Sequence, residues 1–172
     1  MTADPVEEFE EYRSELLEKL GGRGGVEVMR SAAEDLEQLW RSATAEQLTR
    51  QASPGDWSAH ETLLHLIDSE LVYGVRMRMI ATQDEPPLPG YDQEAWIQRF
   101  GPLESDPRES LEIWLALRRL NLRVLEALGE EEMDRVGLHS ERGPESIRLI
   151  ADLLGGHDLN HLDQIRSAIE GK

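Results

Sequence analysis

The last long segment of the chain, residues 144–170, reads PESIRLIADLLGGHDLNHLDQIRSAIE. Its apolar residues and its two histidines recur at steps of three and four, which is the spacing of one helix face. This face comprises Ile147, Ile150, Leu154, His157, His161, Ile165 and Ala168. The pattern predicts a helix from Pro144 to about Glu170, with His157 and His161 one turn apart on the side that faces a core.

Helical periodicity also dominates the rest of the chain, and the alternating runs typical of β-strands are missing. Ser58 with Glu61 forms a capping-box pattern, and Asp106 with Pro107 marks a second helix start. Expected helices therefore cover about 6–20, 26–42, 58–81 and 106–128, with a short turn after Thr44 and a short helix near 92–100.

Two stretches rich in glycine or proline divide these helices. The first, GGRGG at residues 21–25, is expected to be a flexible joint, because four glycines in five residues strongly disfavour a continuous helix. Residues 1–24 are therefore expected to form an N-terminal helix with its Gly-rich joint, and residues 25–172 a bundle of four main helices. The second stretch, 83–105, is too long for a tight turn and predicts a crossover or a lid. The expected fold class is all-α.

Composition excludes several classes of function. The 172 residues include 35 Asp and Glu against 18 Lys and Arg, a net charge of −17, and no Cys. Such a surface repels nucleic-acid phosphates and anionic lipids, so neither nucleic acid nor membrane is an expected partner. Without Cys there is no disulfide, thiolate metal site or cysteine nucleophile. The N-terminal stretch resembles no signal peptide, so we expect a cytoplasmic protein. The expected partner is a small-molecule substrate.

The histidines are the candidate metal ligands. Unsatisfied polar groups inside a bundle cost about 1–3 kcal/mol each, and a divalent ion satisfies His157 and His161 together. His65 lies between two leucines on the expected helix 58–81, and Asp68 follows on the same side. Three imidazoles leave a coordination position for water or substrate. Nitrogen ligands favour Zn²⁺ or Ni²⁺, with Co²⁺, Fe²⁺ and Mn²⁺ as alternatives.

A plainer interpretation stays open, because a histidine on an apolar face is usually satisfied by hydrogen bonds within the core. We assign no ligand role to His60, expected to be solvated near a helix start, or to His139, expected in a polar loop. Five arginines are expected to pair with the abundant carboxylates rather than to bind phosphate. They are Arg76, Arg78, Arg118, Arg119 and Arg123.

Two motifs together suggest a family. Residues 56–66, DWSAHETLLHL, resemble the W-S-x-x-E-x-x-x-H-L opening of the second bundle helix in the DinB/YfiT-like metalloenzyme superfamily. Residues 157–165, HDLNHLDQI, resemble its closing H-x-x-x-H-x-x-Q-I. The resemblance implies a four-helix bundle of up-down-down-up topology, often dimeric, with a divalent metal on His65, His157 and His161. Many relatives carry Arg or a further His around the closing motif, where this chain has Asn160 and Leu162.

The resemblance also implies an activity. Enzymes of the superfamily include transferases and isomerases that use low-molecular-weight thiols, so the first expectation is a metal-dependent thiol S-transferase. The expected assembly is a homodimer. Because the chain has no Cys, the thiol would come from outside. The alternatives are a metal-dependent hydrolase, a non-catalytic metal or small-molecule binder, and a structural dimer whose histidines only hydrogen-bond.

Four further residues are candidates for the site. Asp68 is a candidate general base or partner of a ligating ring, and Gln164 a candidate to orient such a ring. Tyr91 and Asp92, in the proline-rich stretch, are candidate pocket walls. The alternative for Asp68 and Gln164 is a solvated or core-satisfied polar role, and for the proline-rich stretch a surface loop.

Overall fold

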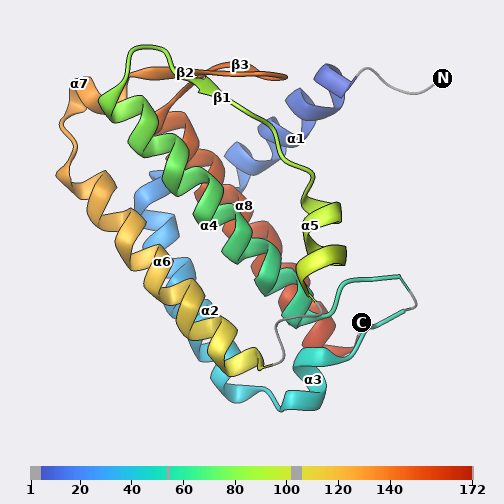
Figure 1. Ribbon diagram of the computed structural model, residues 1–172. Helices are drawn as coiled ribbons and strands as arrows, with labels where there is room; N and C mark the ends of the chain where they lie inside the picture. Colours follow the sequence, from blue (N-terminus) through green and yellow to red (C-terminus); the bar gives the residue numbers. More distant parts are fainter. Residues whose placement is uncertain (1–4, 54, 102–105, 172) are drawn as a thin grey trace.

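Four long helices form the body of the protein. The computed structural model describes residues 5–53, 55–101 and 106–171. The bundle comprises α2 (Gly25–Ser42), α4 (Ala59–Thr82), α6 (Pro107–Ala127) and α8 (Ile147–Glu170), and α1 (Pro5–Lys19) is the additional N-terminal helix. In Figure 1, α2 and α8 run in one direction and α4 and α6 in the other. The expected four-helix bundle of up-down-down-up topology is therefore confirmed.

The parallel course of α4 and α6 requires a long return across the bundle. The chain leaves the end of α4, forms β1 (Pro87–Leu88) and α5 (Gln93–Phe100), and reaches the start of α6 at the opposite end (Figure 1). A crossover was one of the two structures expected for this stretch. Residues 102–105 of the stretch, Pro102 included, lie outside the described residues, as do residues 1–4 and 54.

Side-chain caps fix where the helices begin. Ser58 Oγ accepts from the Glu61 backbone N–H at 3.1 Å, and Glu61 Oε2 accepts from the Ser58 N–H at 2.8 Å. The short helix α3 (Ala45–Thr49) has the same capping box, on Thr44. These caps satisfy N–H groups that the first helical turn leaves free. The expected starts are confirmed here.

A small sheet was not expected. Besides α7 (Glu130–Met133), the connection between α6 and α8 forms β2 (Val136–His139) and β3 (Gly143–Ser146). β2 pairs with β3 antiparallel and with β1 parallel, so the three strands close one end of the bundle (Figure 1). The polar loop expected around His139 is therefore a hairpin. The last helix begins at Ile147 rather than Pro144, because Ser146 Oγ accepts from the Leu149 N–H at 3.1 Å and caps it.

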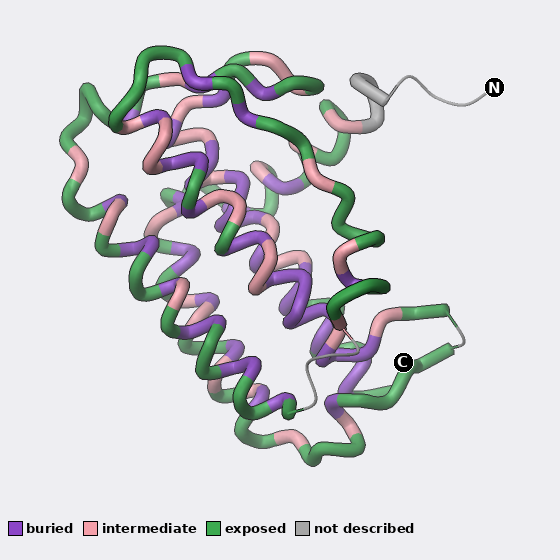
Figure 2. The backbone as a smooth tube through the Cα atoms, in the orientation of Figure 1, coloured by how far each residue is buried: buried purple, intermediate pink, exposed green. Residues whose placement is uncertain are grey.

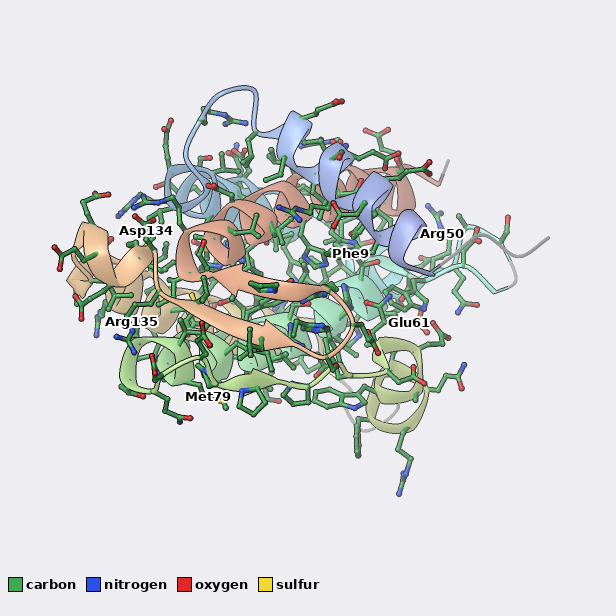
Figure 3. All side chains as sticks on the ribbon, turned by 90° about the horizontal axis from the view of Figure 1, so that it is seen from above. Phe9, Arg50, Glu61, Met79, Asp134 and Arg135 are labelled. Carbon is green, nitrogen blue, oxygen red and sulfur yellow. The ribbon has the colours of Figure 1, made fainter. Side chains whose placement is uncertain are left out.

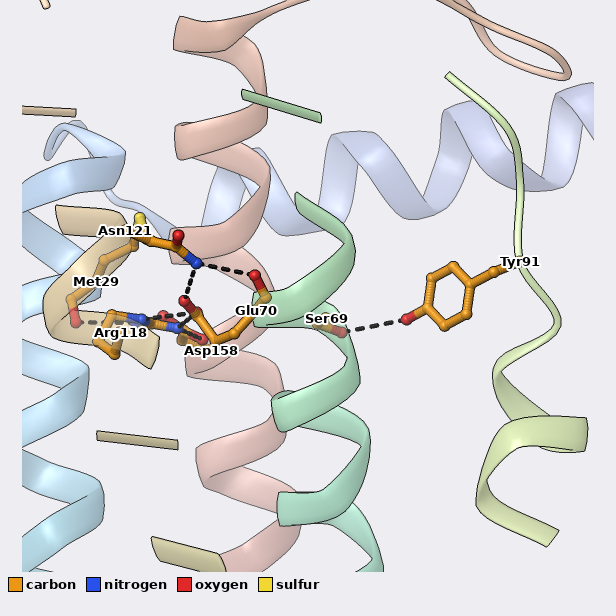
Figure 4. A network of polar contacts seen from close by, with 7 residues as sticks. All are labelled: Met29, Ser69, Glu70, Tyr91, Arg118, Asn121 and Asp158. Atoms are coloured by element: carbon orange, nitrogen blue, oxygen red, sulfur yellow. Dashed lines mark hydrogen bonds and ion pairs between the residues drawn. The ribbon is translucent and has the colours of Figure 1, made fainter. Parts of the chain in front are cut away.

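The core consists of two apolar clusters separated by a buried polar layer. One cluster includes Trp40, Leu63 and Trp114, and the other Met29, Met77 and Ile150. Figure 2 shows the buried faces of the long helices turned toward each other. Between the clusters, Arg118 Nε donates to Glu70 Oε1 at 2.8 Å and Nη2 to Asp158 Oδ1 at 2.8 Å (Figure 4). Asn121 and the Met29 carbonyl complete this network. The expectation that Arg118 pairs with carboxylates is confirmed.

The N-terminal helix packs directly on α8. A Cβ atom built on Gly156 would lie 2.1 Å from the Leu16 carbonyl oxygen, so only glycine permits this approach of the two backbones. Leu16 and Leu20 are buried in the contact. Among the helices that the structure describes, none is long and apolar enough to span a bilayer.

Candidate metal centre

Three histidines meet between α4 and α8. His157 Nε2 lies 2.9 Å from His65 Nε2 and 3.0 Å from His161 Nε2. His157 and His161 are one turn apart on α8, and His65 faces them from α4. One ring nitrogen from each histidine lies within 4.8 Å of the other two, and no carboxylate among the described residues joins this group. The structure thus brings together the three predicted ligands.

A neighbouring side chain sets the proton on one ring. His161 Nδ1 lies 2.8 Å from Gln164 Oε1, and because an amide oxygen only accepts, Nδ1 carries the proton. His161 Nε2 therefore presents a lone pair to the other two histidines. Gln164 lies where it can orient a ligating ring, which is the position that the sequence proposed for it.

Burial keeps all three rings neutral near pH 7. Desolvation, helped by His161, lowers the pKa of His65 to about 3. Burial and the neighbouring rings lower the pKa of His157 well below its usual value, and burial lowers that of His161. Neutral imidazole is the form that binds a metal ion.

Protons alone do not satisfy this arrangement. His157 Nε2 faces the Nε2 atoms of His65 and His161, and the His161 atom presents a lone pair. A ring nitrogen either donates or accepts a hydrogen bond, so His157 Nε2 cannot satisfy both neighbours with one proton. The Nδ1 atoms of His65 and His157 are also buried without a described hydrogen-bond partner, so the protons can reside there and leave three lone pairs pointing inward. A divalent ion accepts three such lone pairs, and three protein ligands leave a further coordination position open. The residues present therefore fit a metal ion.

The histidines form one end of a cavity of about 370 Å³, a volume suited to a small molecule. Trp57 packs beside His65, with ring centroids 5.3 Å apart. Tyr12 and Leu16 of α1 line another wall, and Phe9 lies between α1 and the hairpin (Figure 3). The N-terminal helix is thus a wall of the site as well as an addition to the bundle.

Of the other predicted site residues, Tyr91 lines the cavity and Asp68 and Asp92 do not. Tyr91 lines the cavity, and its hydroxyl lies 3.3 Å from Ser69 Oγ (Figure 4). Asp92 is exposed and caps α5, accepting from the Ala95 N–H at 2.9 Å. Asp68 lines a separate hollow beside α5, where burial raises its pKa to about 6. The structure does not bring Asp68 or Asp92 into the cavity. Ser69 takes the cavity-lining position one turn after His65, and Asp92 lies at the surface.

Several residues differ from expectation, and of the five arginines expected to pair with carboxylates only Arg118 forms an ion pair among the described residues. His60 is buried rather than solvated, with Nε2 2.9 Å from Ser110 Oγ. His139 is buried in β2, within 3.2 Å of Arg76 Nη2. Arg76 lines the cavity, and no described carboxylate forms an ion pair with it. Arg76 follows His65 by about three helical turns, a signal of a shared face that the sequence already contained.

Comparisons with known proteins show the family of this chain. The sequence model described as the DinB superfamily matches residues 29–165. Two Oceanobacillus iheyensis proteins named as candidate metal-dependent hydrolases are similar to this chain. One is 27% identical over 146 residues, 81% of this chain and 83% of that protein, and the other 26% identical over 132 residues, 74% and 73%.

A solved structure has the same fold. It is YfiT from Bacillus subtilis, described as a candidate metal-dependent hydrolase with an unusual four-helix bundle topology. It superposes with a TM-score of 0.76 at 22% identity, covering 84% of this chain and 83% of that one.

Proposed function

The chain belongs to the DinB superfamily, and from this membership and its histidine cluster we propose that it is a metal-dependent hydrolase. The metal would be held by His65, His157 and His161. The observation that carries the proposal is the convergence of three neutral Nε2 atoms at one end of a small-molecule cavity. The hydrolase names of the two Oceanobacillus relatives and of YfiT support the same reaction class.

The chemistry divides between the ion and the chain. When bound, a divalent ion on three imidazoles supplies a Lewis acid and brings the ionisation of water close to neutral pH. Gln164 holds the His161 ring in the required tautomer. The Tyr91 hydroxyl, which Ser69 contacts from α4, is positioned at the cavity wall to hydrogen-bond a substrate oxygen.

Thiol transfer, the first expectation from sequence, has less support than hydrolysis. The relatives compared above carry hydrolase names. The chain has no Cys, so a thiol substrate would have to enter the same cavity from outside. The thiol cosubstrate and the homodimer stay predictions, and the assay below includes a thiol arm for the first of them.

The proposal is tested by screening untagged, metal-loaded protein against panels of carboxylic esters, amides and phosphate esters. A parallel panel combines low-molecular-weight thiols with electrophiles. We expect saturable hydrolysis that is lost in His65→Ala and kept in His60→Gln, a matched control because His60 lies outside the cluster. Circular dichroism checks that both variants fold.

Three other results would overturn the proposal. Turnover only in the thiol panel would make the protein a transferase. Bound metal without turnover in either panel would make it a binder. Hydrolysis that survives in His65→Ala would place the reaction elsewhere.

A further inference from the structure

Arg76 is a buried cation that forms no ion pair with a described carboxylate. Its residue is 3% exposed, and its guanidinium lies 5.0 Å from the centre of the Tyr73 ring. Nη2 donates to the Pro89 carbonyl at 2.6 Å and to His139 Nε2 at 3.2 Å. Nε and Nη1 are buried and have no hydrogen-bond partner among the described residues. A buried charge without a counter-ion is costly, so this arrangement calls for an explanation.

The other deeply buried arginine shows what a structural role looks like in this protein. Arg118 is 1% exposed, but it contacts the carboxylates of both Glu70 and Asp158 and the Met29 carbonyl. These carboxylates raise the pKa of Arg118, whereas burial lowers the pKa of Arg76. Arg118 forms ion pairs with two carboxylates, whereas Arg76 forms none with a described carboxylate.

Arg76 lies in the same cavity as the histidines. His65, Ser69, Tyr73 and Arg76 all line it from one face of α4. Arg76 follows His65 by 11 residues, a rise of about 16 Å along the helix axis at 1.5 Å per residue. The histidines and the guanidinium are therefore at separate ends of the cavity, within reach of one small molecule.

The other charged groups at this end do not neutralise Arg76. Arg142, from the hairpin, forms two hydrogen bonds with Glu145, at 2.7 and 3.0 Å, so its charge is matched. Glu141 also lines the cavity, but it is exposed and forms no ion pair with Arg76. Arg76 is thus the cation at this end of the cavity that lacks an ion-paired carboxylate among the described residues.

We infer that the Arg76 end of the cavity binds an oxyanion, a carboxylate or a phosphate, carried by the substrate. Two guanidinium nitrogens, Nε and Nη1, have no partner among the described residues, and each can donate a charge-assisted hydrogen bond to such a group. The inference rests on the proposed function only in placing the hydrolysed bond at the histidine end. It therefore narrows the substrate to a small molecule with an oxyanion at one end and a hydrolysable bond several ångströms away.

The test measures anion binding to metal-stripped protein by isothermal titration calorimetry, at a temperature where every variant is folded. The probes are glutarate and inorganic phosphate, with neutral glutaramide as the control ligand. We expect saturable binding of an anion but not of glutaramide, weakened at least tenfold in Arg76→Gln. Arg41→Gln is the matched control, since it removes the same charge from an exposed site on α2. The tighter of the two anions identifies the chemical source of the oxyanion.

Two further variants keep the result interpretable. Arg76→Lys retains the charge but has a single donor nitrogen, so we expect intermediate affinity. It replaces Arg76→Gln as the test if that variant does not fold. His60→Gln should bind the anion like the wild type, because His60 lies outside this cavity and Arg76 is intact. Equal anion affinity in wild type and the Arg76 variants, or no saturable binding, would overturn the inference. This test involves neither metal nor turnover, so a negative result here would not contradict the hydrolase proposal, which the hydrolysis assay tests separately.

Discussion

Gln164 Oε1 accepts a hydrogen bond from His161 Nδ1 at 2.8 Å, three residues away on α8. This contact places the His161 proton on the outer nitrogen and turns the inner lone pair toward His65 and His157. The His161 ring is therefore oriented for metal binding by Gln164 before any ion binds.

Removing that contact should weaken metal binding. We expect Gln164→Ala to lower the affinity for Zn²⁺ about 10- to 100-fold, the usual effect of losing a group that orients a ligating histidine. Competition with a chromophoric chelator measures the affinity. Gln98→Ala, on α5, removes an exposed glutamine and should change nothing. Unchanged affinity in Gln164→Ala would mean that packing alone orients the ring.

The buried layer around Arg118 predicts a large loss of stability. Arg118→Met leaves Glu70 and Asp158 buried without their cation, so we expect unfolding free energy to fall by about 3–5 kcal/mol. Urea denaturation measures it. Arg148→Met, which removes an exposed arginine that bridges two carboxylates, should have little effect. Similar losses in both variants would contradict the special role of the buried layer.

The contact of α1 with α8 depends on the missing side chain at Gly156. Gly156→Ala places a methyl group against the Leu16 carbonyl, so we expect a loss of about 1–3 kcal/mol and faster proteolysis of α1. Gly24→Ala is the control, since no atom lies within 4 Å of its added Cβ. Proteolysis of α1 at the wild-type rate in Gly156→Ala would show that α1 does not need this approach.

Asp68 should make stability depend on pH. Its pKa rises from 3.8 to about 6 on folding, because burial disfavours the carboxylate. The folded state thus holds this proton more tightly, and stability is lost as pH rises from about 4 to 6. Asp68→Asn removes that loss, so we expect a gain of about 1 kcal/mol at pH 7.5, after allowance for partial exposure, and none near pH 3.5.

The same variant tests the role first proposed for Asp68. Because Asp68 lines a different hollow from the histidines, Asp68→Asn should keep hydrolysis. Loss of activity with metal still bound would restore Asp68 as the general base. Thermal unfolding across the pH range and the hydrolysis assay together decide the matter.

Features encoded within a few residues were predictable from the sequence. Ser58 and Glu61 cap α4 through hydrogen bonds three residues apart. The histidine stripe of α8 follows from helical spacing, and the family resemblance connected it to His65, 92 residues earlier. Gln164 was found in the same way, because its partner is on the same helix.

Features that depend on distant partners were missed. His60 looked solvated because its partner, Ser110, is 50 residues away. The strands of the hairpin have four residues each, too few for an alternating pattern to be recognised. Pro144 was interpreted as the start of the last helix, but the residue that caps this helix is Ser146, two positions later. Arg76 was assigned a carboxylate partner on the strength of overall acidity, which does not reveal where each carboxylate lies.

The metal content of the untagged protein is the most direct test of the central claim. We expect inductively coupled plasma mass spectrometry to find about one divalent ion per wild-type chain, a loss of that ion in His157→Ala, and its retention in His60→Gln. Wild-type protein without bound metal after incubation with Zn²⁺ or Ni²⁺, or equal metal content in wild type and His157→Ala, would contradict the account.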